Sequence, residues 1–320
     1  MEKIKITKRG LLYLNSGIEN SRELNGAKFN YAIVKTQRHL DEEIKAIQAA
    51  NEPSKEFLEY HSKLYELMKS FQMLDDKQKP IVIISGGIGV LKIKLENEKE
   101  FAEKAESLRK KYSSDIKRQK EQNDIYNEEI LNELIEIEAH KITADDLPDK
   151  FTLGHGHGIL PLIDTIKIID KGKVKFPNHK IIGYRKFFGP LFSFNEKSFV
   201  ISMIENLRIL SKLQEEILTS KIYTDYFNIY EKQRKKLCES FSEMDIYGNP
   251  KVIGREYAIT GIAEFNFELE KLRKKYKKII DDYEELMKKD VDLSVNIISF
   301  DCLPKDISGQ QMQVIIDFVK

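Results

Sequence analysis

Two histidines separated by one residue are the most metal-like feature of the sequence. His155 and His157 alternate with glycines, and on an extended segment two imidazoles at this spacing can share one metal ion. A metal site also needs a third ligand, and the nearest acidic residues are Asp145, Asp146 and Asp149. We predict a flexible loop without a metal here, and His155 and His157 are the only metal candidates.

A glycine turn and two cysteines are further residues that could do chemistry. Residues 85–89 read Ser-Gly-Gly-Ile-Gly after an apolar run, but a second apolar run follows them, whereas phosphate-binding loops lead directly into a helix. Cys238 and Cys302 form no Cys-x-x-Cys pair, so we expect free thiols. No recognisable set of nucleophile, base and acid occurs, and we predict a non-enzymatic protein without a cofactor.

Two basic runs suggest nucleic acid as an alternative partner. Each run contains the string Leu-Arg-Lys-Lys-Tyr, which starts at Leu108 and again at Leu272. Acidic residues such as Asp281 and Glu284 follow the second run, an order that favours ion pairs along a solvated helix. Contacts to phosphates or to a nucleotide are the alternative. The candidate residues for this alternative are Arg109, Lys110, Lys111, Arg273, Lys274, Lys275, Lys277 and Lys278.

Composition and charge narrow the class of protein. The 320 residues carry a net charge of +1, with 33% charged and 41% hydrophobic side chains, a mixture that suits helices with large solvated faces. A nearly neutral chain has no global field that would attract nucleic acid or anionic lipid. No apolar run approaches the ~18 residues of a membrane span, and the N-terminus lacks the apolar core of a signal peptide. We expect a cytoplasmic protein that binds no membrane.

The stretch 29–83 recurs as residues 199–253. At a shift of 170 the two stretches share thirteen identical residues in 55 positions, against roughly three or four expected by chance. The string Leu-Arg-Lys-Lys-Tyr recurs at a shift of 164, and the second half has no counterparts of the two histidines. We therefore predict a tandem duplication with domains at 1–170 and 171–320, joined at about residues 170–180. The identical pairs are Phe29/Phe199, Arg38/Arg208, Leu40/Leu210, Ile47/Ile217, Phe57/Phe227, Tyr60/Tyr230, Leu67/Leu237, Ser70/Ser240, Phe71/Phe241, Asp75/Asp245, Pro80/Pro250, Val82/Val252 and Ile83/Ile253.

The spacing of apolar residues predicts the elements of each unit. Steps of three and four residues within 29–47 and within 57–71 predict amphipathic helices, and the second has an a/d seam. Apolar runs on both sides of a turn predict β-hairpins at about 80–95 and 247–259. We predict a mostly α fold with small β elements (α+β). Each unit is expected to form an antiparallel coiled-coil hairpin with a β-hairpin at its tip, on a small base of strands and a short helix.

Two apolar groups are candidates for binding a protein partner. Aromatic residues cluster at 187–194 in the second half only, and we weigh core packing at the joint against an exposed patch, because aromatic residues dominate interface hot spots. The hairpin tips place apolar strands at the end of an arm, where an unpaired edge invites strand addition. The candidate partner-binding residues are Phe187, Phe188, Phe192, Phe194, Ile84, Ile88, Val90 and Tyr257.

Several short motifs resemble those of short phage-encoded helical proteins of uncharacterised function, each a single unit of this kind. The motifs are an aromatic entry to the first helix at residues 28–35, an Asp-x-x-Gly-x-Pro turn at 245–250, and a closing Leu-Pro with a capped helix at 146–148 and 303–308. The first half departs from the pattern by having Gln78-Lys79-Pro80 in its turn. The resemblance implies a phage accessory protein, here duplicated in tandem, and it implies no catalytic residue.

Together these observations predict a non-enzymatic protein-binding protein. The resemblance implies an inhibitor or clamp that acts on a bacterial host complex, a defence complex included, in the cytoplasm of the host cell. Two alternatives stay open: binding of nucleic acid or nucleotide through the basic helix faces, and a chaperone-like component of the virion or its assembly. Whether the chain forms a homo-oligomer is also open.

Overall fold

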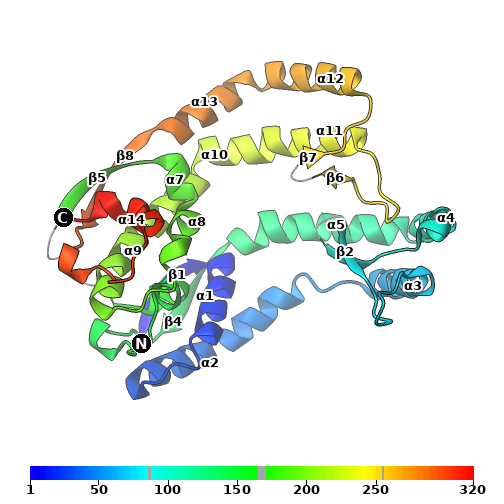
Figure 1. The fold of residues 1–320 in the computed structure, drawn as a ribbon. Helices are drawn as coiled ribbons and strands as arrows, with labels where there is room; N and C mark the ends of the chain where they lie inside the picture. Colours follow the sequence, from blue (N-terminus) through cyan, green and yellow to red (C-terminus); the bar gives the residue numbers. More distant parts are fainter. Residues whose placement is uncertain (86–87, 165–170, 254–255) are drawn as a thin grey trace. The chain divides into compact units, whose positions relative to one another are not determined.

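A computed structural model describes residues 1–85, 88–164, 171–253 and 256–320 (Figure 1). The structure is mostly helical, at 64%, with small antiparallel pairs of strands, so the predicted α+β class is confirmed. In the described part of the chain, no helix has both the length and the apolar character that crossing a membrane requires.

Contacts divide the chain into two compact units, and each unit takes residues from both sequence halves. Unit 1 comprises residues 1–50, 127–224 and 281–320, and unit 2 comprises residues 51–126 and 225–280. The chain therefore passes between the units at four places, so this division does not follow the halves 1–170 and 171–320. Each half contributes strands and long helices to unit 1 and a hairpin with its flanking helices to unit 2.

Unit 1 is built on two antiparallel strand pairs, each with a long helix packed on it. β1 pairs with β4, and β5 pairs with β8. In the first pair Ile4 lies opposite Ile137, and in the second Val174 lies opposite Leu293. Helix α2 packs on β4 and α9 packs on β8. The elements of unit 1 are β1 (Glu2–Thr7), α1 (Lys8–Asn20), α2 (Ala27–Ala49), β4 (Leu134–Ala139), α6 (Leu153–Gly158), β5 (Lys171–Pro177), α7 (Asn178–Ile182), α8 (Tyr184–Phe188), α9 (Lys197–Thr219), α10 (Lys221–Asp225), β8 (Asp290–Asn296) and α14 (Gly309–Ile315).

Unit 2 consists of two helix pairs, each joined through a short β-hairpin. Helix α3 packs on α4, with β2 and β3 between them in sequence, and α11 packs on α12, with β6 and β7 between them. Ser54 caps α3 by accepting a hydrogen bond from the backbone of Phe57, which explains why this helix starts directly after Pro53. The elements of unit 2, including helices that continue across its boundaries, are α3 (Lys55–Phe71), β2 (Val82–Ser85), β3 (Ile88–Leu91), α4 (Glu98–Lys111), α5 (Ser113–Glu128), the π-helical segment Tyr226–Glu231, α11 (Lys232–Phe241), β6 (Val252–Ile253), β7 (Glu256–Tyr257), α12 (Ile262–Lys275) and α13 (Lys277–Lys288).

The predicted joint at about residues 170–180 coincides with the strand β5 from residue 171 onward, in which alternating Val174 and Phe176 bury their side chains in the pairing with β8; Asp170 lies outside the described residues. The second helix that the first coiled-coil arm requires is two helices in the structure, α4 and α5. The break lies at Tyr112, whose backbone (φ −105°, ψ 20°) leaves the helical region.

Candidate protein-binding surface

A turn in unit 2 is organised by the side chain of Asp245. Its Oδ1 accepts hydrogen bonds from the backbone N–H groups of Tyr247 and Asn249, both at 2.9 Å. Gly248 has φ +77°, a left-handed conformation that glycine adopts without a steric penalty. We call residues 245–250 the tyrosine turn. Its Asp-x-x-Gly pattern is the chemistry of an Asx turn, so the sequence specifies this geometry locally.

Residues 75–80 form a second turn with the same hydrogen bonds, which we call the lysine turn. The Oδ1 of Asp75 accepts from the backbone N–H groups of Lys77 and Lys79, both at 2.8 Å. Gln78 takes the place of Gly248 and also has a positive φ, of 60°. Lys77 therefore stands where the tyrosine turn has Tyr247. Both are the third residue of their turn.

Tyr247 is buried between the helices and hairpin of the first half. Its hydroxyl donates a hydrogen bond to the carbonyl oxygen of Leu91 at 2.7 Å, and its ring lies edge-on to Phe101 with centroids 5.6 Å apart. Only 8% of Tyr247 is exposed, and this burial raises the pKa of its hydroxyl. Tyr247 belongs to one apolar cluster with Met68 and Ala105. A residue of the second half thus completes a core of the first.

Polar contacts fix the rest of the tyrosine turn. The hydroxyl of Ser85 donates to Oδ2 of Asp245 at 2.5 Å, and Nδ2 of Asn249 donates to Oγ of Ser85 at 3.0 Å. The Arg109 guanidinium lies directly over Gly248, where an added Cβ would fall 1.1 Å from its Nη1. Glycine at this position therefore serves both the backbone conformation and the close approach. Arg109, one of the residues proposed to bind nucleic acid, is engaged inside unit 2.

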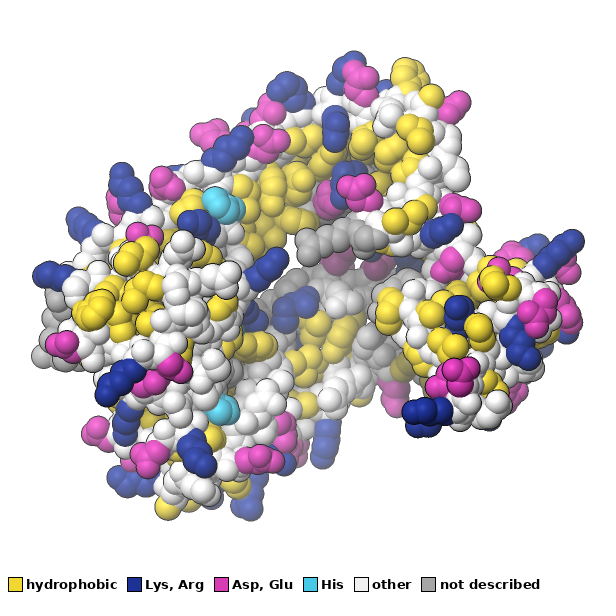
Figure 2. All heavy atoms as spheres, in the orientation of Figure 1, with side chains coloured by type: hydrophobic (Ala, Val, Ile, Leu, Met, Phe, Trp, Pro, Cys, Tyr) yellow, Lys and Arg dark blue, Asp and Glu magenta, His cyan; other side chains and the backbone are white. Residues whose placement is uncertain are grey.

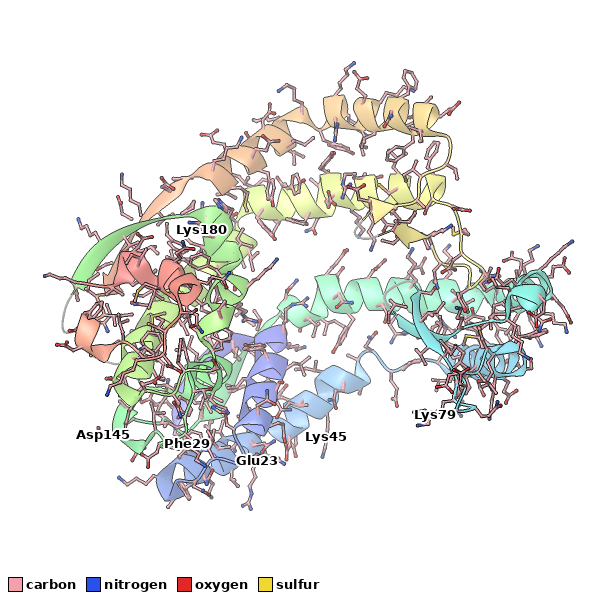
Figure 3. All side chains as sticks on the ribbon, in the orientation of Figure 1. Glu23, Phe29, Lys45, Lys79, Asp145 and Lys180 are labelled. Atoms are coloured by element: carbon pink, nitrogen blue, oxygen red, sulfur yellow. The ribbon has the colours of Figure 1, made fainter. Side chains whose placement is uncertain are left out.

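The lysine turn, in contrast, is solvent-exposed throughout. Lys77 and its neighbours from residue 73 to 80 are exposed. Figure 3 labels Lys79 on this turn. A lysine would have to lose its hydration to enter an apolar cluster like that around Tyr247, and this cost explains why the two turns behave differently.

Aliphatic side chains are exposed on the first strand of both hairpins. On β2, Val82 is 60% exposed and Ile84 75%; on β6, Val252 is 49% exposed and Ile253 68%. Both hairpins are two-stranded sheets. Among the described residues, the outer edge of each strand therefore forms no ladder with a further strand. Solvent-exposed aliphatic residues on such edges are candidates for strand addition by a partner.

The other predicted hairpin residues are placed differently. Val90 is buried in the cluster around Tyr247, and Tyr257 is half-buried. Ile88 begins β3, but its side chain and the turn residues 86–87 lie outside the described part of the structure. Of the hairpin candidates whose side chains are described, Ile84 is the one that a partner can reach freely.

The aromatic cluster at residues 187–194 lies in the core of unit 1, which decides between the two readings of this segment. Phe188 and Phe194 are buried, and Phe187 and Phe192 are half-buried. The ring of Phe188 packs edge-on against Phe318 at 5.7 Å. The short helix α8 and the turn after it bring all four rings inward, so they do not form an exposed patch.

His155 and His157 lie on helix α6 and not on a flexible loop. In a helix, residues two apart point about 200° away from each other, so these imidazoles cannot converge on one ion. Nδ1 of His155 accepts from the backbone N–H of Thr152 at 3.0 Å, completing a capping box that starts the helix. Gly17 of α1 packs against Gly158 so closely that a Cβ on Gly17 would lie 2.3 Å from its carbonyl oxygen. The glycines thus permit helix packing.

His157 is buried and uses both ring nitrogens within unit 1. Nδ1 lies 2.6 Å from the hydroxyl of Tyr13, and Nε2 lies 3.0 Å from the hydroxyl of Tyr184. Burial, with a smaller contribution from the nearby Arg185 charge, lowers the pKa of His157 to about 4. Among the described residues, no cluster of three or more His, Cys, Asp or Glu side chains could hold a metal ion.

Several basic candidates are engaged by neighbouring side chains on their own helices. Lys110 pairs with Glu106 and Lys274 pairs with Glu270, in each case an acidic residue four positions before the lysine, an order that stabilises a solvated helix. The ammonium groups of Lys111 and Lys275 lie over the rings of the adjacent Tyr112 and Tyr276. Arg273, Lys277 and Lys278 are exposed on α12 and α13. This pattern favours solvated helix faces over a continuous phosphate-binding stripe.

Both cysteines are free thiols. Cys238 is buried, and burial raises the pKa of its thiol, so a smaller fraction of it is the reactive thiolate. Cys302 is partly exposed. No protein-family model, curated protein or solved structure matches the chain.

Sequence reasoning did not identify Tyr247 or Gly248 as functional residues. A signal was present, because the aligned turns differ at these two positions while keeping Asp and Pro at both ends. An aromatic residue and a glycine in one of two turns that share only their first and last residues are a sequence signal that this turn meets another surface.

Proposed function

We propose that the chain is a duplicated, non-enzymatic protein-binding protein that holds its partner with the apolar hairpins of unit 2. Support for the duplication comes from matching elements. Helices α2 and α9 each span 23 residues, and α4 and α12 each span 14. In this proposal each half contributes a coiled-coil arm, α3 with α4 and α11 with α12, with a β-hairpin at its tip.

The observation that carries the binding proposal is the exposure of Val82, Ile84 and Ile253 on two-stranded sheets. Monomeric proteins protect such strands with charges, prolines or covering segments. Here aliphatic side chains stand beside an open edge in both hairpins. A partner strand that pairs with this edge would gain backbone hydrogen bonds and cover the aliphatic side chains at the same time.

The resemblance to phage-encoded proteins supports a bacterial host complex, a defence complex included, as the target. The chain would act there as an inhibitor or clamp. Two non-identical hairpins in one unit also suit a grip on two neighbouring sites, since linked binding sites raise the effective concentration of the second contact.

The proposal is tested by capture from a bacterial host lysate with full-length chains. Ile84→Asp and Ile253→Asp place a charge on each strand, and Leu58→Asp on α3 is the matched control, because Leu58 is 53% exposed outside the hairpins. We expect the wild-type chain and the Leu58 variant to retain one stoichiometric partner, identified by mass spectrometry, and the strand variants to lose it. Equal capture by all chains, or no stoichiometric partner at all, contradicts the proposal.

A further inference from the structure

The face that Tyr247 covers on the first helix pair has a counterpart on the second. Backbone hydrogen bonds establish the correspondence of the hairpins: the N–H of Lys92 donates to Ile81, and that of Ala258 donates to Lys251. Leu91, which accepts from Tyr247, thus corresponds to Tyr257. On the helices, the recurring Leu-Arg-Lys-Lys-Tyr string relates Phe101, Ala105 and Arg109 to Phe265, Leu269 and Arg273. We call Leu91, Phe101, Ala105 and Arg109 the first receiving face, and Tyr257, Phe265, Leu269 and Arg273 the second receiving face.

The two receiving faces differ in burial at every position. Leu91, Phe101 and Ala105 are buried in the cluster to which Tyr247 belongs, and Tyr247 contacts Leu91 and Phe101 directly. Tyr257, Phe265 and Leu269 are only half-buried, and α12 has no buried residue at all. Figure 2 shows hydrophobic side chains among the charged ones over α11 and α12. The second receiving face therefore retains the apolar residues and the arginine of a docking surface, but the described residues place no turn on it.

The chain contains no second tyrosine turn that could cover this face. The tyrosine turn itself is docked on the first receiving face, and the lysine turn carries Lys77 where an aromatic ring is needed. We propose that the second receiving face binds a tyrosine-bearing, acidic β-turn of a partner protein, of the Asp-x-Tyr-Gly type that residues 245–248 represent. This inference rests on the proposed protein-binding function and names the chemistry of the partner.

Charge and shape both fit this occupant. A partner turn with a carboxylate would meet the positive charge of Arg273, which is exposed on α12. A glycine after the tyrosine lets the turn backbone approach the guanidinium, as Gly248 does at Arg109. An aromatic ring supplies apolar area to Phe265 and Leu269, which are only half-buried without it.

The probe is a synthetic cyclised peptide of residues 243–251, fluorescently labelled and titrated into the full-length chain, with fluorescence anisotropy as the readout. We expect saturable one-to-one binding that weakens more than about tenfold when the peptide carries Ala in place of its tyrosine. Arg273→Glu, on the exposed surface of α12, is expected to weaken binding about fivefold. Lys274→Glu is the matched control on the same turn of the helix, and we expect no change.

Three results would overturn the inference. The first is that the peptide does not bind, although the same chain still captures its partner through the strands of the hairpins. This result would leave the proposed function intact. The second is binding that is insensitive to Arg273→Glu but stronger in a Tyr247→Ala chain, because the peptide would then occupy the first receiving face. The third is concentration-dependent self-association that the peptide suppresses, measured by sedimentation, which would assign the face to a second copy of the chain.

Discussion

The hydroxyl of Tyr247 donates a hydrogen bond to the carbonyl oxygen of Leu91, 156 residues earlier in the chain. This contact joins the two halves of the sequence inside unit 2. It also distinguishes the two turns, since Lys77 occupies the same position as Tyr247 and stays in solvent. The stability of unit 2 should therefore depend on one aromatic residue whose aligned counterpart contributes little.

Replacement of Tyr247 tests this dependence. We expect Tyr247→Ala to lower the free energy of unfolding of unit 2 by roughly 3 kcal/mol, the usual effect of deleting a large buried side chain. Tyr247→Phe keeps the ring and loses the hydrogen bond to Leu91, so we expect the free energy of unfolding to fall by about 1 kcal/mol. Denaturant unfolding with hydrogen exchange on α4 measures both. Lys77→Ala is the control, and a similar loss in that variant would show that Tyr247 has no special role.

Substitution of Gly248 provides a second test of the tyrosine turn, because backbone strain and the close contact with Arg109 can be separated at this position. Gly248→Ala puts a side chain at a positive φ, at a cost of about 1–2 kcal/mol, and also forces Arg109 away from the turn. Gly261→Ala carries the same backbone strain (φ +62°) without a close contact. We expect Gly248→Ala to reduce the melting temperature further than Gly261→Ala does. The excess should shrink when Arg109 is also changed to Ala; an unchanged excess would count against the packing of Arg109 on the turn.

The burial of His157 predicts how unit 1 responds to acid. The pKa of His157 is about 4 in the folded chain, below its ordinary value of 6.5. Between these values the unfolded chain binds the proton more readily, so the free energy of unfolding decreases as the pH falls from 6.5 towards 4. The loss is at most about 3 kcal/mol and levels off below pH 4.

A His157→Gln variant isolates this contribution, because an amide can still hydrogen-bond with Tyr13 and Tyr184 but does not titrate. We expect its unfolding free energy to vary less than that of the wild type between pH 6.5 and 4, measured by chemical denaturation at several pH values. Identical slopes for the two proteins would show that the imidazole does not remain neutral in unit 1.

The contact of Gly17 with Gly158 makes a steric prediction for unit 1. Gly17→Ala places a methyl group 2.3 Å from the carbonyl oxygen of Gly158, so helices α1 and α6 must separate. We expect a loss of about 1–3 kcal/mol in unfolding free energy, typical of overpacking. Gly189→Ala is the matched control, since nothing lies within 4 Å of its added Cβ, and a change of no more than about 0.5 kcal/mol is expected there.

Most of the elements that could be predicted from the sequence were predicted from the local periodicity of apolar residues. The residues from Phe29 to Ile47 that recur at helical spacing are the ones that α2 buries, because a helix packed on a strand pair needs a continuous apolar stripe. Helix α6 was missed because three glycines in six residues argue against a helix, while close neighbours surround each of them: Gly17 at Gly158, Phe192 at Gly154 and Ile204 at Gly156. The site was harder to predict, since Tyr247 and Leu91 lie 156 residues apart in the sequence and no local pattern relates them.

The four passages of the chain between the units have a thermodynamic consequence. Each segment of unit 2, 51–126 and 225–280, begins and ends in unit 1. When unit 2 opens while unit 1 stays folded, both segments remain closed loops, with much less conformational freedom than chains with free ends. Unit 1 thus acts as a built-in cross-link for unit 2. A single backbone cleavage within either segment would release that constraint and make the opened form of unit 2 more accessible without changing any side chain.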